Sequence, residues 1–339
     1  MAPAKKIGYA VVGLGSIAKS SVLPAFSNTK HARLVAVVGR KQSAAEAIAK
    51  QFRALHAYTS ADFSKCLANP EVDAVYIATP PGAHLEFVLS AAKAGKHILC
   101  EKPLAATVAQ AEKIVAAARK YRVQLMTAYR KHFEPSTLYV KELVQSGALG
   151  RIDAIHTTFS ELHVPGKSLD WLLSSSMAGG GPLTDLGVYC LNTSRWILGK
   201  DPTSAIAQSW RNEKRYRQVE QGISFRLTFP GNIVIHGSSS YGAVLSSLLF
   251  IQGTKGWLSL TPAFPFDEER LLTGKIEGRW LEKKFKIVDE FAPELDALAK
   301  AVQTGKRIQP DGEQGLRDMK IIRAIYQSAK QRKPVQIKY

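Results

Sequence analysis

The chain has 339 residues, 45% of them apolar and 22% charged, and a formal net charge of +18. This length suits about two domains, and this composition excludes an intrinsically disordered chain. No apolar run approaches the roughly 18 residues of a membrane span, and Met1 to Ala10 lacks the apolar core of a signal peptide. We therefore expect a folded protein without a membrane partner.

The cysteines and the basic residues indicate which metal sites, cellular location and partners to expect. Cys66, Cys100 and Cys190 are scattered without metal-ligand spacing, which indicates reduced thiols, no metal site and a cytoplasmic location. Lysines and arginines are spread from Lys5 to Lys338, whereas a nucleic-acid binder gathers them on one face. We expect no nucleic-acid partner, and a basic surface that favours an anionic cofactor.

The first motif is glycine-rich and follows an apolar strand predicted over residues 7–13. It reads Gly13-Leu14-Gly15-Ser16-Ile17-Ala18 and opens a helix, and a second strand over residues 34–38 comes next. In a dinucleotide-binding unit the first glycine permits a tight turn and the second lets the backbone approach a pyrophosphate. The strand–turn–helix context favours this reading over an ordinary glycine-rich turn. The candidate cofactor residues here are Gly13, Gly15, Ser16 and Ile17.

The second strand ends in residues that bear on cofactor choice. NAD-selective sites place an acidic residue here, about 20 residues past the glycines, but residues 32–44 contain no Asp or Glu. Arg40 and Lys41 stand where a 2′-phosphate would lie, and arginine binds phosphate in bidentate fashion. We predict NADP, held by Gly39, Arg40, Lys41 and Ser43; the alternative is that both bases are solvated surface charges.

Strands and helices continue to alternate as far as residue 128. The pattern predicts strands at 74–78, 97–100 and 123–128 and helices at 61–67, 83–94 and 108–121. Such alternation is typical of a doubly wound parallel sheet, a Rossmann domain over residues 1–128. Thr79, Pro80 and His84, around the loop after one strand, are candidate cofactor contacts; His84 is more typical of a helix-start or packing residue.

The motif Glu101-Lys102-Pro103 comes directly after a buried strand, at the sheet edge where ligands bind in such folds. A later segment, residues 179–198, begins with three consecutive glycines, followed by Pro182 and a predicted helix. Asp185 and Tyr189, four residues apart, share one helical face. An amine, a carboxylate and a phenol in one pocket would suit proton transfer at a carbinol while a hydride leaves its carbon.

Beyond residue 128 the pattern changes to strands without helices between them, which indicates a mostly antiparallel sheet. The predicted strands are 152–159, 205–210, 222–229, 233–241, 246–252 and 256–260. Further helices are predicted at 133–145, 293–303 and 312–331. The fold class is therefore α/β, with a Rossmann sheet followed by an α+β domain over residues 129–339 whose sheet is open.

Taken together, these motifs resemble the glucose–fructose oxidoreductase / inositol dehydrogenase / rhizopine-catabolism oxidoreductase family, and within it the glucose–fructose oxidoreductase branch. The resemblance runs nearly end to end. The segments that carry it are residues 13–18, Glu101-Lys102-Pro103, Tyr129-Arg130-Lys131-His132-Phe133-Glu134-Pro135, 178–189, Ser238-Ser239-Ser240-Tyr241 and 312–315.

The resemblance implies an NAD(P)-dependent dehydrogenase of sugars, cyclitols or similar polyols. Members of the family pack their open sheet faces together, which implies a homodimer or homotetramer. Many members have histidine where this chain has Tyr189; the tyrosine is typical of the branch that handles aldoses with NADP and of dihydrodiol dehydrogenases. The chain lacks the export segment of the periplasmic enzyme, which favours a cytoplasmic location and leaves permanent cofactor retention open. Leu172 replaces an arginine common after Trp171.

For the reaction, we expect Tyr189 to be the general acid/base and Lys102 to favour its phenolate. Asp185 would bind a sugar hydroxyl or orient Lys102. Tyr189 could instead be a core aromatic residue satisfied by Asp185, and Lys102 could only position the cofactor. The expected substrate contacts are Lys102, Arg130, His163, Asp185 and Tyr189, and the expected cofactor contacts also include Glu101, Lys102, Arg130 and Trp171.

Three functions compete at this stage. The first is an NADP-dependent oxidoreductase of aldoses or related polyols, either a dehydrogenase or an enzyme that passes hydride between two sugars. The second is a non-catalytic regulator that senses NADP or a sugar. The third is a dihydrodiol- or xylose-type dehydrogenase.

Overall fold

The structure, a computed structural model, describes residues 5–163 and 170–339 and divides into two compact units. Unit 1 comprises residues 1–129 and 289–316, and unit 2 comprises residues 130–288 and 317–339. The boundary expected near residue 128 therefore omits a segment that returns to the first unit. This return needs long-range packing, which a local sequence pattern does not report.

Unit 1 is built on a parallel sheet, six-stranded in the described part of the chain, with the order β3-β2-β1-β4-β5-β6. Every pair of neighbours is parallel. Its strands are β1 (Ile7–Val12), β2 (Ala32–Gly39), β3 (His56–Thr59), β4 (Ala74–Ile77), β5 (His97–Glu101) and β6 (Leu125–Ala128). All six residues of β1 are buried, as expected for a central strand covered on both faces.

The helices of unit 1 cover this sheet. A π-helix η1 (Ala18–Val22) follows the glycine motif and continues through α1 (Leu23–Ala25) and η2 (Phe26–Asn28). The others are α2 (Gln42–Phe52), α3 (Phe63–Ala68), α4 (Pro81–Lys93), α5 (Val108–Lys120) and α9 (Phe291–Thr304). The α9 segment is held by Asp296, which accepts from the amides of Lys30, His31 and Ala32.

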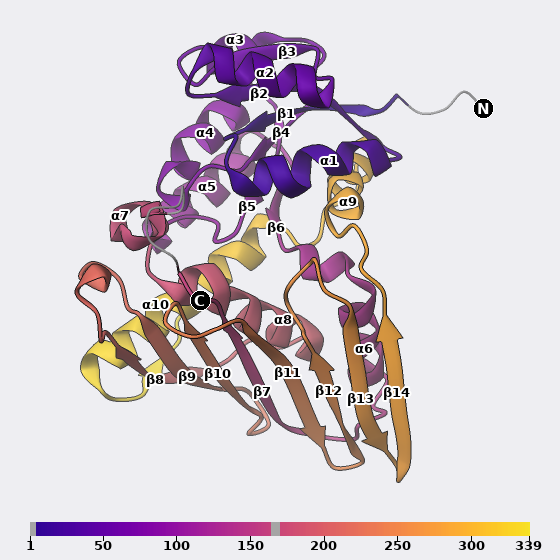
Figure 1. Cartoon of the computed structure of the whole chain (residues 1–339), viewed down its shortest axis with the longest axis vertical. Helices are drawn as coiled ribbons and strands as arrows, with labels where there is room; N and C mark the ends of the chain where they lie inside the picture. The colour runs from indigo at the N-terminus through magenta and orange to yellow at the C-terminus, as the bar shows by residue number, and fades with distance from the viewer. Residues whose placement is uncertain (1–4, 164–169) are drawn as a thin grey trace. The chain divides into compact units, whose positions relative to one another are not determined.

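Unit 2 is built on a mixed sheet, nine-stranded where the structure describes the chain, whose strands lie side by side in Figure 1. The order is β14-β13-β12-β11-β7-β10-β9-β8-β15, and β7 and β10 pair in parallel. The strands are β7 (Ile152–Ser160), β8 (Ser204–Trp210), β9 (Gly222–Thr228), β10 (Val234–Ser240), β11 (Ser246–Gly253), β12 (Gly256–Thr261), β13 (Arg270–Ile276), β14 (Arg279–Phe285) and β15 (Val335–Gln336).

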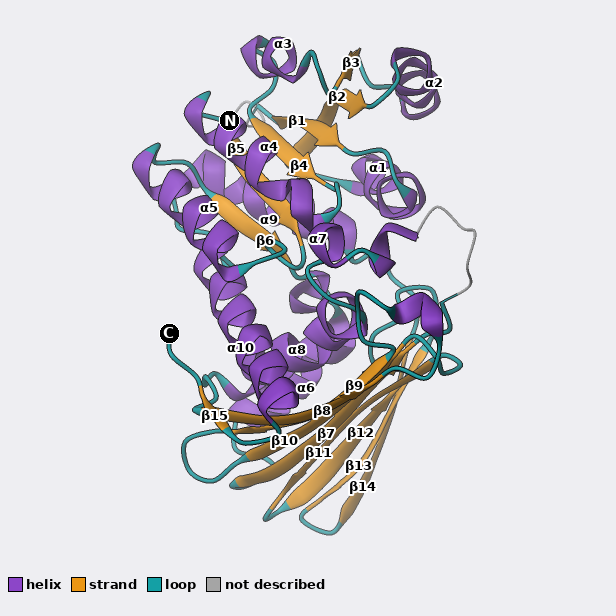
Figure 2. Cartoon of the chain, turned by 90° about the vertical axis from the view of Figure 1, so that its left-hand side faces the viewer, coloured by secondary structure: helices purple, strands orange, loops and turns teal. Residues whose placement is uncertain are grey.

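The longer helices of unit 2 lie on one face of the mixed sheet (Figure 2). They are α6 (Pro135–Gln145) and α8 (Val188–Leu198), with the later turns of α10 (Gly312–Gln331), which crosses from unit 1 into unit 2. Short helices connect them: η3 (Arg130–Phe133), η4 (Asp170–Leu173), α7 (Ser175–Ala178), η5 (Leu183–Gly187) and η6 (Lys214–Tyr216). None of the described helices is long and apolar enough to cross a membrane.

The predicted fold class is confirmed, and several elements were missed. The sequence pattern did not predict β3, α2, β13, β14 or β15. The edge strand β14 reads Arg-Trp-Leu-Glu-Lys-Lys-Phe, and such charged edge strands hide the usual alternation while they discourage pairing with another chain. The predicted helix from Pro182 to Leu198 is a π-helical turn followed by an α-helix.

Candidate functional site

The glycine loop of unit 1 has the shape that a dinucleotide requires. Gly13 has a φ of +90°, and a Cβ there would lie 2.8 Å from the backbone of Ala78. At Gly15 a Cβ would meet nothing within 4 Å, so the backbone can be approached. The buried hydroxyl of Thr79 finds no hydrogen-bond partner among the described residues. These residues therefore fit a pyrophosphate held by backbone amides, as the motif predicts.

The predicted adenosine side lies at the same edge of the parallel sheet. Because β1 and β2 are parallel neighbours, the residues after both strands meet at their carboxyl ends. Gly39, the last residue of β2, is so close to Leu14 that a Cβ would lie 3.0 Å from its side chain. Arg40 and Lys41 follow, both exposed, and Ser43 is exposed on the first turn of α2. The basic side chains of Arg40 and Lys41 are therefore exposed beside the glycine loop.

Glu101 and Lys102 come at the carboxyl end of β5, as predicted. The carboxylate of Glu101 accepts from the hydroxyl of Tyr76 at 2.7 Å and from the amide of Lys102 at 3.2 Å. Tyr76 is fully buried in β4, so it fixes this carboxylate to the sheet. Glu101 is thereby placed to set the direction in which the chain leaves β5 at Lys102.

His84 is fully buried in α4 and connects two loops of unit 1. Its Nε2 lies 2.7 Å from the carbonyl oxygen of Thr79 and its Nδ1 lies 3.2 Å from that of Leu104. Burial lowers the pKa of His84, which keeps the ring neutral. This geometry supports the packing role; a direct contact of His84 or Pro80 with the cofactor stays a prediction.

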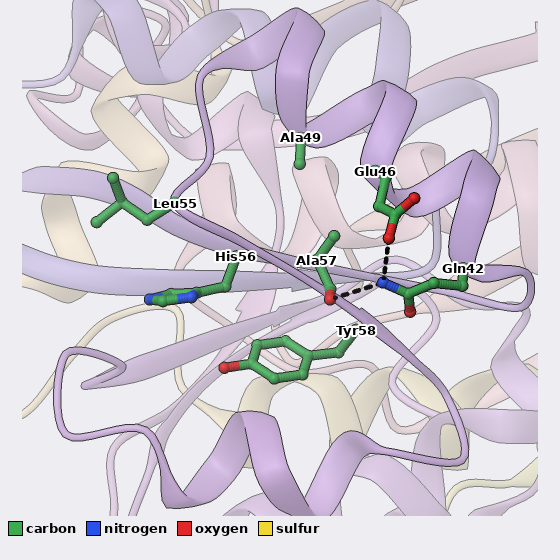
Figure 3. Close-up of a pocket in the computed structure, with 7 residues that line it drawn as sticks. All are labelled: Gln42, Glu46, Ala49, Leu55, His56, Ala57 and Tyr58. Carbon is green, nitrogen blue, oxygen red and sulfur yellow. Dashed lines mark hydrogen bonds between the residues drawn. The ribbon is translucent and has the colours of Figure 1, made fainter.

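A shallow hollow of 340 Å³ lies beside the edge strand β3 (Figure 3). Its lining residues are Gln42, Glu46, Ala49, Leu55, His56, Ala57 and Tyr58. The amide of Gln42 donates to Glu46 at 2.9 Å and to the carbonyl oxygen of Ala57 at 3.3 Å. The predicted cofactor residues do not line it, so we assign it no role in the reaction.

In unit 2, Asp185 and Tyr189 lie on consecutive helical segments. Asp185 belongs to the π-helix η5 and Tyr189 to α8, and both side chains are half-buried. Single π-helical turns inside helices often mark functional sites. Tyr241, at the end of β10, donates its hydroxyl to Oδ2 of Asp185 at 3.1 Å. Asp185 is therefore oriented by a buried tyrosine that sequence reasoning did not place in the site.

Arg130 is 5% exposed and lies against Tyr189. Its Nε donates to the Tyr189 hydroxyl oxygen at 3.2 Å, and its Nη2 donates to the carbonyl oxygen of Phe264 at 2.8 Å. Its guanidinium carbon lies 4.8 Å from the centre of the Tyr189 ring. Since the tyrosine oxygen accepts from Arg130, its own proton must point to a different group. Arg130 thus brings a positive charge to the phenol within unit 2.

The remaining predicted residues lie around Tyr241 and on η4. His163 is 7% exposed; its ring centre lies 5.6 Å from that of Tyr241, and its Nε2 lies 3.7 Å from Asp170. Burial lowers the pKa of His163. Trp171 follows Asp170 on η4. The middle of the predicted substrate loop, residues 164–169, lies outside the described residues.

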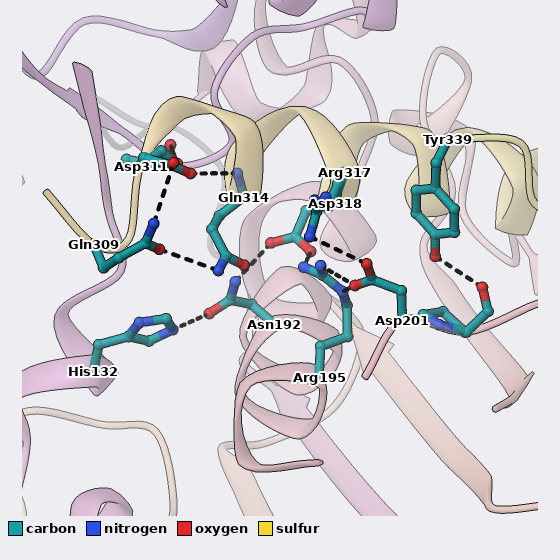
Figure 4. Close-up of polar contacts among 12 residues, drawn as sticks. His132, Asn192, Arg195, Asp201, Gln309, Asp311, Gln314, Arg317, Asp318 and Tyr339 are labelled. Atoms are coloured by element: carbon teal, nitrogen blue, oxygen red, sulfur yellow. Dashed lines mark hydrogen bonds and ion pairs between the residues drawn. The ribbon is translucent and has the colours of Figure 1, made fainter. Parts of the chain in front are cut away.

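A buried polar network anchors α8 behind the site (Figure 4). Asn192 donates to Asp318 at 2.7 Å, and Arg195 forms an ion pair with the same carboxylate and another with Asp201. His132 donates from Nε2 to the side-chain oxygen of Asn192 at 2.9 Å. Because Asp318 belongs to α10, these contacts hold the helix that carries Tyr189 against a segment more than a hundred residues away.

The structure thus brings Asp185, Tyr189, Arg130 and His163 into unit 2, while the glycine loop, Arg40, Glu101 and Lys102 belong to unit 1. The meeting of Lys102 with Asp185 and Tyr189 stays a prediction. Sequence reasoning left Tyr76 and Tyr241 out of the site. Only Tyr241 could have been found from the sequence, because it ends the Ser238–Tyr241 segment that carries part of the family resemblance. Among the described residues, no cluster of three His, Cys, Asp or Glu could hold a metal ion.

Comparison with known proteins decides the family. Residues 7–129 match the oxidoreductase family model with an NAD-binding Rossmann fold, and residues 137–259 match the GFO/IDH/MocA C-terminal domain. The chain belongs to the GFO/IDH/MocA oxidoreductase family. The resemblance seen in the sequence is thereby confirmed. This family member is an oxidoreductase with a domain for a nicotinamide dinucleotide.

Three relatives cover most or all of this oxidoreductase. A D-xylose 1-dehydrogenase [NADP(+)] of Haloarcula marismortui is 31% identical over 98% of this chain and 93% of its own. The crystal structure of an aldose-aldose oxidoreductase from Caulobacter crescentus, complexed with glycerol, has a TM-score of 0.93 and 32% identity over 98% of this chain and 100% of its own. A trans-1,2-dihydrobenzene-1,2-diol dehydrogenase of Mus musculus is 33% identical over 73% of this chain and 72% of its own.

Proposed function

We propose that this oxidoreductase transfers a hydride between NADP and a hydroxyl-bearing carbon of an aldose or related polyol. Two relatives that match nearly the whole chain are named for aldose chemistry, and one of them is named for NADP(+). The observation that carries the proposal is the hydrogen bond from Arg130 to the Tyr189 hydroxyl oxygen, at 3.2 Å. Tyr189 lies on α8, which continues directly from the π-helical turn that contains Asp185.

In the proposed oxidation, a dinucleotide held at the glycine loop by Gly13 and Gly15 would supply the hydride acceptor. Tyr189 takes the proton from the substrate hydroxyl oxygen as the hydride leaves the carbon that bears it, so that a carbonyl remains. The guanidinium of Arg130 stabilises the negative charge that the phenol oxygen carries before it accepts that proton. In the reverse direction Tyr189 gives the proton back. Such acid–base assistance contributes about 10²–10⁴ in rate.

Asp185 and Lys102 have supporting roles in this proposal. Asp185 accepts a hydrogen bond from a substrate hydroxyl, and Tyr241 orients its carboxylate by donating to Oδ2. Lys102, at the carboxyl end of β5, stabilises the alkoxide that forms at the reacting carbon. Tyr76 and Glu101 set the backbone from which Lys102 projects. The joint action of these residues with Tyr189 is part of the proposal.

For the cofactor, we propose that Arg40 and Lys41 bind the 2′-phosphate of NADP. Both side chains are exposed at the end of β2, beside the glycine loop. An acidic residue that would repel a phosphate is missing from residues 32–44 of the sequence. The binding energy would come from charge-assisted hydrogen bonds.

A single-turnover measurement tests the function. The protein is mixed with a stoichiometric amount of NADP⁺, aldoses are added one at a time, and the absorbance of reduced nicotinamide is followed. A rise with one aldose supports the proposal. If a second aldose then reverses the rise, the enzyme passes hydride between sugars, as the name of the Caulobacter crescentus relative describes for that protein. No rise with any aldose, although NADP⁺ binds, would contradict the proposal and favour a sensor.

A second candidate is oxidation of a cyclic diol. The Mus musculus relative is named for this reaction, and it aligns over about three quarters of the chain. The chemistry at Tyr189 would be unchanged, and only the substrate would differ. Comparing initial rates on aldoses and on cyclic diols at equal concentration separates the two candidates.

We also propose that the chain forms a homodimer or homotetramer through the open face of the mixed sheet. Aromatic and imidazole rings follow one another across this face: His236 and His156 stack at 5.1 Å, and Phe250, Trp257 and Trp280 continue the row. Trp280 is 61% exposed, and exposed apolar surface of this kind marks interaction sites. Sedimentation of the Trp280→Lys variant against the unaltered protein would test this.

A further inference from the structure

A buried glutamate stands at the start of the helix that carries the candidate site. Glu220 is 4% exposed, lies just before β9, and uses both carboxylate oxygens. Oε2 accepts from the amide of Gly181 at 3.0 Å, and Oε1 accepts from the amide of Leu183 at 3.1 Å. The hydroxyl of Tyr326, on α10, also donates to Oε1 at 2.8 Å. Burial raises the pKa of Glu220, whereas these three hydrogen bonds act to lower it.

These contacts satisfy the first amides of the helix. Helix N-termini leave amides without partners inside the helix, and a negative charge there is stabilising. Gly181 and Leu183 flank Pro182, which has no amide hydrogen, so Glu220 binds the two donors of this turn. The turn leads into η5 with Asp185 and then into α8 with Tyr189. The start of this helical stretch is therefore held by one carboxylate, together with the Tyr326 hydroxyl oxygen, which accepts from the Gly181 amide at 3.3 Å.

The glycine run before the helix makes room for this arrangement. A Cβ at Gly181 would lie 2.5 Å from the carbonyl oxygen of Glu220 and 2.9 Å from its carboxyl carbon. A Cβ at Gly180 would overlap the hydroxyl of Tyr326. Two of the three glycines are therefore required because Glu220 and Tyr326 occupy the space that side chains would take.

Gln221, the next residue along the chain, supports the side chain of Asp185 through Tyr241. The carbonyl oxygen of Gln221 accepts from the amide of Tyr241 at 2.9 Å, and the hydroxyl of Tyr241 donates to Asp185 at 3.1 Å. Glu220 thus fixes the backbone that carries Asp185, while Gln221 fixes the tyrosine that orients its side chain. Two consecutive residues, Glu220 and Gln221, therefore support the backbone and the side chain of Asp185.

We propose that Glu220 is a positioning residue for Asp185 and Tyr189, which holds the start of their helix at the place where proton transfer is efficient. This inference rests on the proposed function. Glu220 itself touches neither substrate nor cofactor in this proposal. A displacement of about 1 Å at a reacting group can lower a rate by about a hundredfold, so a loosened helix start has a kinetic signature.

The test compares Glu220→Gln with a matched control, Glu134→Gln. Glu134 is also buried in unit 2, and its carboxylate accepts from two amides at a helix start, those of Ser136 and Thr137. It also pairs with Lys131 and Arg270, so its replacement is the stricter control for a general loss of stability. Its helix, α6, carries none of the predicted site residues. Each variant replaces one acceptor oxygen by an amide group that faces backbone donors. Both should lower stability, but only the first should loosen the site.

Three readouts decide the outcome: kcat and KM for the aldose, the Kd of NADPH, and hydrogen–deuterium exchange of residues 179–190. For Glu220→Gln we expect kcat to fall about 10- to 100-fold, with an unchanged Kd and faster exchange of that segment. For Glu134→Gln we expect unchanged kcat and unchanged exchange there. Full kcat in Glu220→Gln, or the same loss in both variants, would overturn the proposal.

A milder variant covers the case in which Glu220→Gln does not fold. Tyr326→Phe removes one donor to Glu220 and keeps the ring, so it should lower kcat in the same direction by less, again with an unchanged Kd of NADPH. Full activity in this variant would then overturn the proposal. If the unaltered protein turns over no aldose, the proposed function fails, and exchange of residues 179–190 alone decides whether Glu220 holds the helix.

Discussion

The two units hold their candidate residues in different ways. In unit 1 each residue follows directly after a strand: Arg40 after β2, Thr79 just after β4 and Lys102 after β5. The parallel register alone brings these strand ends to one edge. In unit 2, Asp185 and Tyr189 share one helical stretch, but their supports come from distant segments that include Glu220, Tyr241 and Asp318.

This difference predicts which amino-acid substitutions have only a local effect and which also lower stability. In unit 1, Arg40 and Lys41 are exposed on a backbone that the sheet fixes, so a substitution at Arg40 should affect only the contact it makes. Unit 2 fixes its residues through buried polar groups, and removing one partner leaves another unsatisfied at about 1–3 kcal/mol or more. The following substitutions probe this contrast.

The largest effect is expected at the reacting tyrosine. Tyr189→Phe removes the hydroxyl that exchanges the proton, so kcat should fall by about 10²–10⁴ while NADPH affinity is unchanged. Stopped-flow absorbance and fluorescence titration measure the two quantities. Tyr139→Phe, on α6, is the control and should keep full turnover. An unaffected rate in Tyr189→Phe would remove this residue from the proton step.

Next comes the buried ion pair behind α8. Asp318 is 1% exposed and accepts from Asn192 and Arg195, so Asp318→Ala leaves both donors without this acceptor. We expect the free energy of unfolding of unit 2 to fall by about 3–5 kcal/mol. Urea denaturation followed by far-UV circular dichroism checks the value. If the loss in the free energy of unfolding is no larger than that of an exposed ion pair, the buried polar groups of unit 2 do not have the greater importance that we expect.

Acid should weaken unit 2 through His132. Burial lowers the pKa of this histidine to about 3, against the opposing hydrogen bond with Asn192. The unfolded chain therefore binds a proton below about pH 6.5 that the folded chain does not, and stability falls as pH decreases. By pH 4.5 the loss should reach about 3 kcal/mol, and His132→Gln should lack this contribution. Identical pH profiles of stability for both proteins would contradict the assignment.

A smaller effect is expected at the cofactor. Arg40→Ser combined with Lys41→Ser removes two exposed bases, and NADP⁺ affinity should fall about 10- to 100-fold because charge-assisted hydrogen bonds are lost. NAD⁺ affinity should be unchanged, since NAD⁺ has no 2′-phosphate. Isothermal titration with both cofactors separates the two cases. Equal losses for NADP⁺ and NAD⁺ would show a general structural effect instead.

The smallest effect is expected at a surface pair of unit 1. Arg119 on α5 lies 2.5 Å from Glu313, and its side chain is 72% exposed. Solvent screens such pairs, so Arg119→Ala should lower the free energy of unfolding by less than about 1 kcal/mol. The same urea measurement as for Asp318→Ala applies. A loss comparable to that of Asp318→Ala would contradict the contrast.

The parallel sheet was accessible to sequence reasoning because its signals are local. A buried strand, a turn with glycines and a helix recur within about 30 residues, and each candidate residue follows its own strand. The strand β3 and helix α2 were missed because β3 has only four residues, all of them partly exposed. The return of residues 289–316 to unit 1 has no local signal at all.

The site in unit 2 was accessible only along one helix. The four-residue spacing and the glycine run identified Asp185 and Tyr189, but no pattern near Glu220 or Tyr326 connects them to Gly181, which lies 39 and 145 positions away. Their role depends on burial and on the register of β9 and α10. Arg130 was expected as a ligand contact, which stays a prediction; its contacts with Tyr189 and Phe264 were not predicted from the sequence.

The returning segment of unit 1 has a consequence for how the chain is made. The sheet is complete once Tyr129 has been synthesised, but α9, which supplies the carbonyl oxygen of Leu295 to the buried Tyr9 hydroxyl, comes much later. At ordinary ribosomal speeds, Leu316 follows Tyr129 by roughly ten to forty seconds. During this interval the surface that α9 covers on β1, β2 and β5 is exposed. Completion of the nucleotide-binding unit therefore awaits the synthesis of residues 289–316, near the end of the printed sequence.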